Sequence, residues 1–287
     1  MPGGLTSLAI AAQPASLRAL RVEERLPARA RVLFTGCGTS YHAALASGPA
    51  VHALDAVLGD APPADVLVAI SHEGETKLTL EAVQRFAGET WTITAAPEAL
   101  IAKACDHVVV ATPEIEKSYC HTVSYTCAVA AGLALRGEDV SGLAGAVEAV
   151  LAAPALPVST HDRWLLVGAG RDWPTALEAT LKLREGVHVA AEAYQTEQLL
   201  HGHLAAIDDG VRAFVLEGEG RAAERAHDAV NALRELGCDV TLLATSHPVV
   251  DIVQFQRLTV DLAQARGVDP DMIRWDEEPW DRARKAT

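Results

Sequence analysis

Short apolar runs alternate with longer helix-like stretches along almost the whole chain. The short runs, often β-branched, are typical of buried strands, and the alanine- and leucine-rich stretches between them have helical spacing. This alternation predicts an α/β fold, in which helices cover both faces of parallel sheets. Strands are expected near residues 31–34, 66–70, 91–94 and 107–111, and again near 163–167, 213–216, 239–243 and 258–260.

The same plan runs twice, which predicts two domains in the 287 residues. Segment 151–157 carries two prolines after a long helical stretch and marks the boundary. We therefore place one domain at residues 1–155 and a second at 156–266, each a parallel sheet flanked by helices. Residues 267–287 contain two prolines and many charges, and are expected to form an irregular or helical tail.

Two loops of small residues follow predicted strands. In the first, Gly36 and Gly38 permit a tight turn, and Thr39 and Ser40 can cap the helix that begins there. The second, at 71–76, also joins a strand to a helix and carries hydroxyl groups. Helix N-termini attract anions, and loops at the carboxyl ends of neighbouring parallel strands converge on one crevice. Either loop alone is equally an ordinary turn, but together they predict a shared polyol or phosphate pocket.

A strongly helical stretch from Pro174 to Ala191 places Glu178, Lys182 and Glu185 on one face, at i, i+4 and i+7. On an isolated helix such a stripe is usually solvated and stabilised by ion pairs. Here the helix follows the loop 168–171, so its first turns are expected beside the cleft. A buried glutamate could then move a proton while the lysine holds developing oxyanion charge.

His201 and His203 flank a glycine in a predicted loop before residues 204–207. Single histidines are most often satisfied structural residues. The pair could also suggest a metal site, but no third ligand is nearby. The sharper hypothesis is that a histidine here assists the opening of a sugar ring.

The formal net charge of −14 argues against nucleic acid or an anionic membrane as partner, because both require a basic surface. No apolar run approaches the length of about 20 residues that spans a membrane. The first residues lack the basic start and apolar core of an export signal. Five scattered cysteines without CxxC spacing favour reduced thiols in a cytoplasmic protein and disfavour zinc. We therefore expect a cytoplasmic protein without a metal.

Several motifs together are similar to the double sugar-isomerase (SIS) domain family. That family includes the isomerase half of glucosamine-6-phosphate synthase and free-standing phosphosugar isomerases and deaminases. The resemblance covers nearly the whole chain. It rests on Cys37-Gly38-Thr39-Ser40, on Ser71-His72-Glu73-Gly74-Glu75-Thr76, on segments 116–122, 174–185 and 191–194, and on His201-Gly202.

The resemblance implies two flavodoxin-like SIS domains and a homodimer whose active site borrows a histidine from the partner subunit. Glu185 would move a proton between C1 and C2 of an open-chain sugar phosphate, His201 would assist ring opening, and Lys182 would support the cleft electrostatically. No cofactor is implied. We find no counterpart of the synthase's glutamine-hydrolysing domain in this sequence, and therefore do not expect glutamine-dependent synthesis by this chain alone. Substrate or phosphate contacts would come from Cys37, Gly38, Thr39, Ser40, Ser71, Glu73, Thr76, His121 and Glu178.

Three positions depart from the family's pattern. Glu73 replaces a serine that meets the phosphate, and a carboxylate there repels a dianion unless it turns away or pairs with a cation. His121 stands where the synthase has a serine. The family's tail ends with a lysine near the substrate, and neither Arg274 nor Lys285 aligns securely with it, although the tail is expected to close on the active site.

Three functions remain open from the sequence. The first is an aldose–ketose isomerase acting on a sugar phosphate or amino-sugar phosphate. The second is an amino-sugar-phosphate deaminase, which shares the ring opening and the proton shuttle and then expels ammonia. The third is a ligand-binding regulator, which needs only the hydroxyl-bearing loops. The presence of Lys182, Glu185 and His201 favours an enzyme, and no DNA-binding segment is evident.

Overall fold

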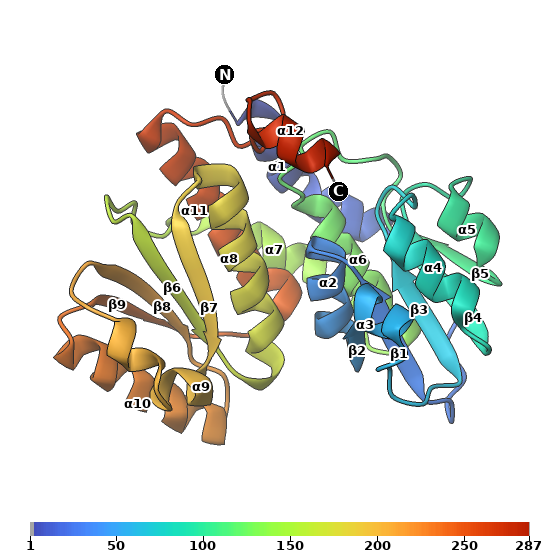
Figure 1. Cartoon of the computed structure of the whole chain (residues 1–287), viewed down its shortest axis with the longest axis horizontal. Helices are drawn as coiled ribbons and strands as arrows, with labels where there is room; N and C mark the ends of the chain where they lie inside the picture. The colour runs from blue at the N-terminus through green and yellow to red at the C-terminus, as the bar shows by residue number, and fades with distance from the viewer. Residues whose placement is uncertain (1–2, 287) are drawn as a thin grey trace. The chain divides into compact units, whose positions relative to one another are not determined.

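The computed structural model describes residues 3–286 and contains two parallel sheets (Figure 1). The chain divides into two compact units, each built around one sheet. The first-sheet unit comprises Ala9–Glu116 and His121–Ala152. The second-sheet unit takes the described residues up to Leu8, the short segment Lys117–Cys120, and the described chain from Ala153 onward. This is the α/β architecture that the alternating pattern predicts.

The first sheet has the strand order β2-β1-β3-β4-β5, with every neighbouring pair parallel. This is the order of flavodoxin-like folds. Its strands are β1 (Val32–Gly36), β2 (Ala50–His52), β3 (Val66–Ile70), β4 (Glu89–Thr94) and β5 (His107–Val110). Its helices are α2 (Thr39–Ser47), α3 (Ala53–Leu58), α4 (Lys77–Arg85), α5 (Leu100–Ala104), α6 (Val123–Leu135) and α7 (Leu143–Ala152).

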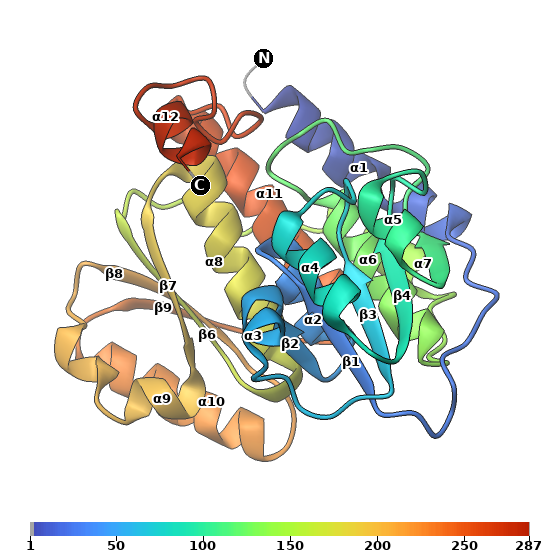
Figure 2. The same cartoon turned by 45° about the vertical axis from the view of Figure 1, so that its right-hand side comes forward.

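Alternation along the strands decides which helices cover which face of the first sheet. Leu33 and Leu67 point to one face, where they join a buried cluster with Val83 of α4 and Ile101 of α5. Figure 2 shows α3, α4 and α5 over this face. Helix α6 is buried along its entire length and packs against α2, as expected of a helix that is apolar all round.

The second sheet has the order β7-β6-β8-β9 and is also parallel throughout. Leu165 and Val215 face helix α10, whereas Trp164 and Phe214 face the opposite side, where Phe255 of α11 meets Phe214 edge to face at 5.4 Å. Its strands are β6 (Arg163–Gly168), β7 (Ala190–Gln195), β8 (Val211–Leu216) and β9 (Asp239–Leu243). Its helical elements are η1 (Gly170–Asp172), α8 (Trp173–Val187), α9 (Thr196–Leu200), η2 (His203–Ala206), α10 (Arg221–Glu235), α11 (Pro248–Arg266) and α12 (Trp280–Lys285).

Two predicted elements are wrong. The strand expected at 258–260 lies inside α11, because the buried residues around it recur at helical spacing from Val249 to Leu262. The helix expected to reach Ala191 ends at Val187, where His188 adopts a left-handed conformation with φ of 60°. Residues 190–195 form the edge strand β7 instead. The three-residue strand β2 was also not predicted from the sequence.

The tail is tied into the second-sheet unit through a buried carboxylate. Asp271 accepts hydrogen bonds from the backbone N–H groups of Leu5 and Thr6 at 3.0 and 2.8 Å, and from the Thr6 hydroxyl at 2.7 Å. The Thr6 hydroxyl also lies 2.7 Å from that of Ser118. Helix α1 (Gly4–Ala19) begins here, so Asp271 serves its unpaired first N–H groups. The predicted tail therefore includes both an anchored segment and the short helix α12.

Two further observations concern the whole described chain. All five cysteines have free thiols. Within residues 3–286, no helix combines the length and the apolar character needed to cross a membrane.

Candidate functional site

Helix α8 carries a buried cluster of three charged side chains in the second-sheet unit. The Lys182 ammonium lies 3.3 Å from a Glu178 carboxylate oxygen and donates a hydrogen bond of 2.7 Å to Glu185. The side chains of Lys182 and Glu178 are fully buried, whereas that of Glu185 is 23% exposed. The predicted stripe is thus an ion-pair network in the interior, and the interpretation as a solvated surface stripe is wrong.

The network keeps Lys182 charged despite its burial. Burial alone lowers the pKa of Lys182, but the carboxylates of Glu185 and Glu178 outweigh this effect and raise it well above the ordinary value. The nearby thiol of Cys120 acts in the same direction. Lys182 is therefore a fixed cation and cannot accept a proton as a base. Of the two carboxylates, only that of Glu185 is open to a ligand.

Close packing of α8 against α11 explains why this charged face is buried. A Cβ placed on Gly186 would lie 2.5 Å from the Thr259 side chain and 3.2 Å from Pro270. Glycine therefore lets α11 and the start of the tail approach the end of α8 that carries Glu185. Charged side chains on the covered face of α8 must then find partners within the protein, and the Lys182 ammonium is the partner of both Glu178 and Glu185.

His201 lies at the opposite end of the second-sheet unit's helix layer. Helix α8 starts at the carboxyl end of β6, as α9 does for β7, and it runs from that edge toward α12 (Figure 1). Glu185 is twelve residues beyond Trp173, which corresponds to about 18 Å along the helix axis. His201 is 73% exposed and pairs with Glu197 at 2.8 Å. The structure thus brings Lys182 and Glu178 to Glu185, but does not bring His201 of the same chain to it.

In the first-sheet unit, both predicted loops follow neighbouring strands at the point where the chain order reverses across the sheet. β1 and β3 are adjacent, with β2 on one side and β4 on the other, and such a switch point is where open α/β sheets bind ligands. A Cβ on Gly36 would lie 2.8 Å from the Ser40 backbone and 3.0 Å from the Ile70 carbonyl oxygen. Gly38 has φ of 54° at the cap of α2. Both glycines are therefore required by the turn itself.

The predicted hydroxyl residues occupy these two loops. Thr39 and Ser40 form the first turn of α2 and are partly exposed, and the Cys37 thiol lies 3.8 Å from the Thr79 hydroxyl. In the second loop, the hydroxyl oxygens of Ser71 and Thr76 are 3.4 Å apart. The loops can therefore offer hydroxyls beside helix N-termini, the arrangement that suits an anion.

Glu73 is exposed, and none of the residues 3–286 forms an ion pair or hydrogen bond with its carboxylate. Gly74, the next residue, has φ of 70° and packs so closely that a Cβ would lie 2.5 Å from Ala99. The backbone of this loop is thus fixed, while the charge that Glu73 adds is left without a protein cation.

A buried carboxylate that the sequence did not single out lies beside this loop. Glu116 accepts hydrogen bonds from the N–H and hydroxyl groups of both Thr122 and Ser124, at 2.6 to 3.0 Å. The His121 Nδ1 atom is 3.9 Å from the same carboxylate. The backbone N–H of Glu116 donates to Nε2 of His72 at 2.8 Å. The usable sequence signal was a glutamate followed by Thr and Ser at the start of a helix.

The two tail cations between which the sequence could not decide, Arg274 and Lys285, both have other partners. Arg274 stacks on the Trp280 ring at 3.9 Å and faces Glu277, and Lys285 donates to Asp281 at 2.6 Å. Within the described residues, no three His, Cys, Asp or Glu side chains are grouped so that they could hold a metal ion.

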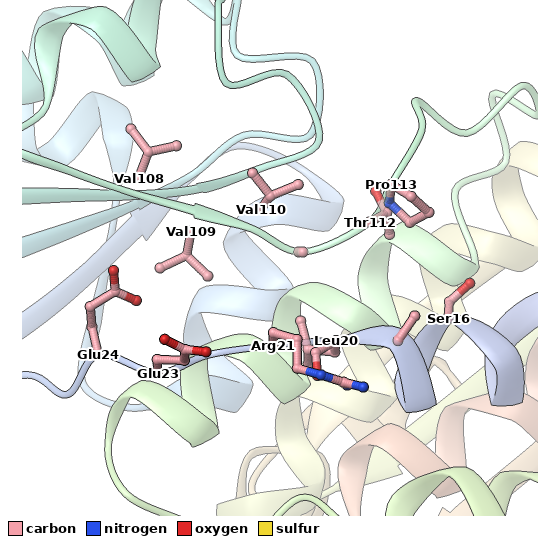
Figure 3. Close-up of a pocket in the computed structure, with 12 residues that line it drawn as sticks. Ser16, Leu20, Arg21, Glu23, Glu24, Val108, Val109, Val110, Thr112 and Pro113 are labelled. Carbon is pink, nitrogen blue, oxygen red and sulfur yellow. The ribbon is translucent and has the colours of Figure 1, made fainter.

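A pocket of about 430 Å³ in the first-sheet unit lies apart from the predicted residues (Figure 3). It is lined by the end of α1, by Glu23 and Glu24, and by β5 with the residues that follow it. Two carboxylates against one guanidinium, that of Arg21, leave a net negative lining that does not suit an anionic ligand. None of the predicted site residues lines it.

Comparison with known proteins assigns part of this architecture. Residues 158–269 match the family described as the SIS domain. The chain is 27% identical to a glutamine–fructose-6-phosphate aminotransferase (isomerizing) of Methanothermobacter thermautotrophicus, over 88% of this chain and 52% of that protein. The same enzyme of Pyrococcus horikoshii is 28% identical over the same shares. The chain thus spans about half the length of these curated relatives.

Solved structures agree with the fold over almost the full chain. The C-terminal domain of glucosamine-fructose-6-phosphate aminotransferase from Francisella tularensis superposes with a TM-score of 0.75 at 19% identity, covering 93% of this chain and 97% of that one. A glucosamine-6-phosphate deaminase from Thermotoga maritima superposes with a TM-score of 0.75 at 21% identity, and a tagatose-6-phosphate ketose/aldose isomerase from Escherichia coli with a TM-score of 0.78 at 18% identity. Each match covers 94% of this chain and 97% of the other chain. Residues 158–269 therefore form an SIS domain, within a chain that is related over most of its length to the glutamine–fructose-6-phosphate aminotransferases.

Proposed function

We propose that this chain is an aldose–ketose isomerase of sugar phosphates, with an amino-sugar phosphate as the favoured substrate. The observation that carries the proposal is the buried Glu178–Lys182–Glu185 network within the SIS domain. Burying three charges costs free energy that a well-packed apolar cluster would not, so the network is weak as a purely structural device. It suits a reaction that moves a proton next to a developing negative charge.

In this mechanism Glu185 takes the proton from C2 of the open-chain aldose and returns it to C1, while the hydroxyl proton passes from O2 to O1, giving the ketose. The partial exposure of its carboxylate supports this role. Lys182 stabilises the negative oxygen of the enediolate intermediate, and its permanent charge suits that task. Glu178 holds Lys182 in place from the buried side. No step requires a metal or an organic cofactor.

His201 would assist ring opening in the active site of a partner subunit. Its exposure and its place at the far end of the helix layer from Glu185 support a role in trans within a homodimer. The phosphate would bind in the first-sheet unit at Cys37, Gly38, Thr39, Ser40, Ser71 and Thr76. We further propose two SIS domains, at 1–155 and 156–266, with the tail 267–287 closing on the site. The strand order 2-1-3-4 shared by both sheets supports this duplication.

A deaminase of amino-sugar phosphates is the second candidate. Its support is structural likeness: a glucosamine-6-phosphate deaminase from Thermotoga maritima shares the fold over 94% of this chain, as the Escherichia coli tagatose-6-phosphate ketose/aldose isomerase does. The two reactions would share Glu185 and Lys182 and differ in whether ammonia leaves. A sugar-binding regulator would need neither, so the buried network argues against it.

The test combines two variants in one assay. Glu185→Gln should lower turnover of fructose 6-phosphate or glucosamine 6-phosphate at least about a hundredfold, because the general base is lost. His201→Ala should also be inactive, yet a 1:1 mixture of the two variants should regain roughly a quarter of wild-type activity, from sites that combine an intact Glu185 with His201 of the partner subunit. Isomerisation is followed by NMR and deamination by released ammonia.

Glu192→Gln is the matched control, since Glu192 is an exposed glutamate on β7. Near-normal turnover by Glu185→Gln would reject the assignment of the base. A mixture that stays inactive would reject the shared site.

A further inference from the structure

The Glu116 carboxylate has no role in the proposed proton shuttle, yet its surroundings are built around its charge. Its side chain is only 1% exposed and accepts hydrogen bonds from four groups on Thr122 and Ser124. Burial raises its pKa, but the neighbouring His121 and the hydrogen bonds from Ser124 outweigh this effect and hold the pKa at about 2. Glu116 is therefore ionised at any physiological pH.

His121 is the one partly exposed group in contact with this carboxylate. Its Nδ1 atom lies 3.2 Å from the Ser124 hydroxyl and 3.9 Å from Glu116. The opposite nitrogen, Nε2, has no partner among the described residues, and the side chain is 24% exposed. One side of the ring is thus held by a buried anion while the other is free for a ligand.

The His72 ring places His121 beside the second predicted loop. The two rings meet edge to face with centroids 5.3 Å apart, and His72 precedes Glu73 in that loop. Nε2 of His72 accepts the backbone N–H of Glu116, so this ring is fixed in its neutral form with the proton on Nδ1. Burial and the neighbouring His121 lower the pKa of His72 to about 4.

Only one of the two rings can therefore bring positive charge to the loop. The carboxylate of Glu116 attracts such a charge on His121. A positive charge is also what the loop lacks, because Glu73 is a carboxylate without a protein cation.

We propose that His121 is a binding residue for the anionic group of a sugar monophosphate, and that Glu116 is the positioning residue that orients its ring and favours its positive charge. The inference rests on the proposed sugar-phosphate function and adds the group that compensates Glu73. The groups facing His121 are Glu116, His72 and the Ser124 hydroxyl. The Cys127 thiol near Glu116, whose pKa burial raises to about 12, stays neutral.

The experiment measures binding as a function of pH by calorimetry. Fructose 6-phosphate at pH 7.5 tests whether the protein binds a sugar phosphate at all. Glucose 6-sulfate is then used from pH 5.5 to 8.5, because its single charge does not titrate in this range and the slope reports on the protein. Wild-type affinity for the sulfate should fall roughly tenfold from the lowest to the highest pH, because an imidazole attracts an anion only while it is protonated.

His121→Gln keeps a hydrogen-bonding side chain that cannot become charged. It should bind more weakly at pH 5.5, by roughly tenfold to a hundredfold, and its affinity should not vary with pH. His121→Ser should behave in the same way, which guards against a folding defect in either variant. Glu116→Gln should flatten the pH profile while His121 is still present, a result that a merely structural role would not give. His107→Ser, an exposed histidine of the same unit, is the control and should match wild type.

The outcomes separate the two proposals. If wild type binds fructose 6-phosphate but both His121 variants keep its affinity and pH slope, the inference is wrong and the proposed function stands. If wild type binds neither ligand, the proposed function fails and the inference falls with it.

Discussion

Replacing Lys182 by methionine should expose the cost of burying Glu178. Both side chains are fully buried, and the ammonium lies 3.3 Å from the Glu178 carboxylate. Methionine fills a similar volume, so the cavity term is small, but the carboxylate keeps no cation beside it. Removing one partner of a buried ion pair costs about 3 to 5 kcal/mol. We expect a loss of this size in the free energy of unfolding at pH 7.5.

The double variant Glu178→Gln/Lys182→Met separates the charge from the packing. Removing both charges relieves the unpaired carboxylate, so the double variant should be more stable than Lys182→Met by at least about 2 kcal/mol. The single variant should also recover stability on acidification. A buried carboxylate without a cation has its pKa raised in the folded state, so folding takes up a proton, and the loss of stability shrinks as the pH falls.

The assay is urea unfolding at pH 7.5 and pH 5.0, followed by far-UV circular dichroism. Lys285→Met is the matched control, because Lys285 is 65% exposed and pairs with Asp281 on the surface. It should cost less than about 1 kcal/mol. A Lys182→Met variant that unfolds like this control, or a double variant less stable than the single one, would refute the reasoning.

Two further predictions concern packing and acid stability. Gly186→Ala should destabilise the chain by about 1 to 3 kcal/mol, because the new methyl group would lie 2.5 Å from Thr259. Gly145→Ala is the control and should be neutral or stabilising, because the space around Gly145 is open. Thermal unfolding of the two variants tests this difference. Acid should weaken the fold in two stages, which urea midpoints from pH 3 to 7 would resolve. The pKa of His72 is about 4 against an ordinary 6.5, so its contribution to the free energy of unfolding is lost as the pH falls from 6.5 to 4. The pKa of Glu116 is about 2 against 4.5, so its contribution is lost below pH 4.5. Glu116→Gln should remove only the second stage, and an unchanged midpoint at low pH in wild type would contradict both assignments.

Elements with an unambiguous period were predictable from the sequence. β3 and β8 are buried at every position, and their apolar runs at 66–70 and 213–216 identify them. The edge strand β7 (Ala190–Gln195) has no clear alternation of apolar and polar residues and follows α8 after only two residues. Its sequence therefore predicts a continuation of the helix. Residues 258–260 gave the opposite error, a helical segment predicted as a strand. Three β-branched or apolar residues in a row do not show that they belong to the longer helix α11.

The candidate site also has a part that was predictable from the sequence and a part that was not. The α8 network was visible because one helix supplies all three residues at fixed spacing, and burial alone had to come from the structure. At Glu116 only the local part was readable, the Thr and Ser that follow it at the start of a helix; its contact with His72, 44 residues away in the sequence, was not. The tail anchor at Asp271 joins residues 265 apart, beyond the reach of any local pattern.

The two buried carboxylate sites also differ in the ligand charge that each would favour. Two carboxylates and one ammonium give the α8 network a formal charge of −1, which repels a phosphate dianion but accepts the neutral carbonyl end of a sugar or its ammonium group. The negative charge of Glu116 is instead stabilised by hydrogen-bond donors and one imidazole. It lies beside loops that offer hydroxyls and helix N-termini. The helix N-termini and hydroxyls, and not the net charge, therefore favour an anionic group at the first-sheet loops, because Glu73, Glu116 and a charged His121 also sum to −1. The α8 network favours an ammonium group over a neutral one, because an ammonium group would offset its excess negative charge.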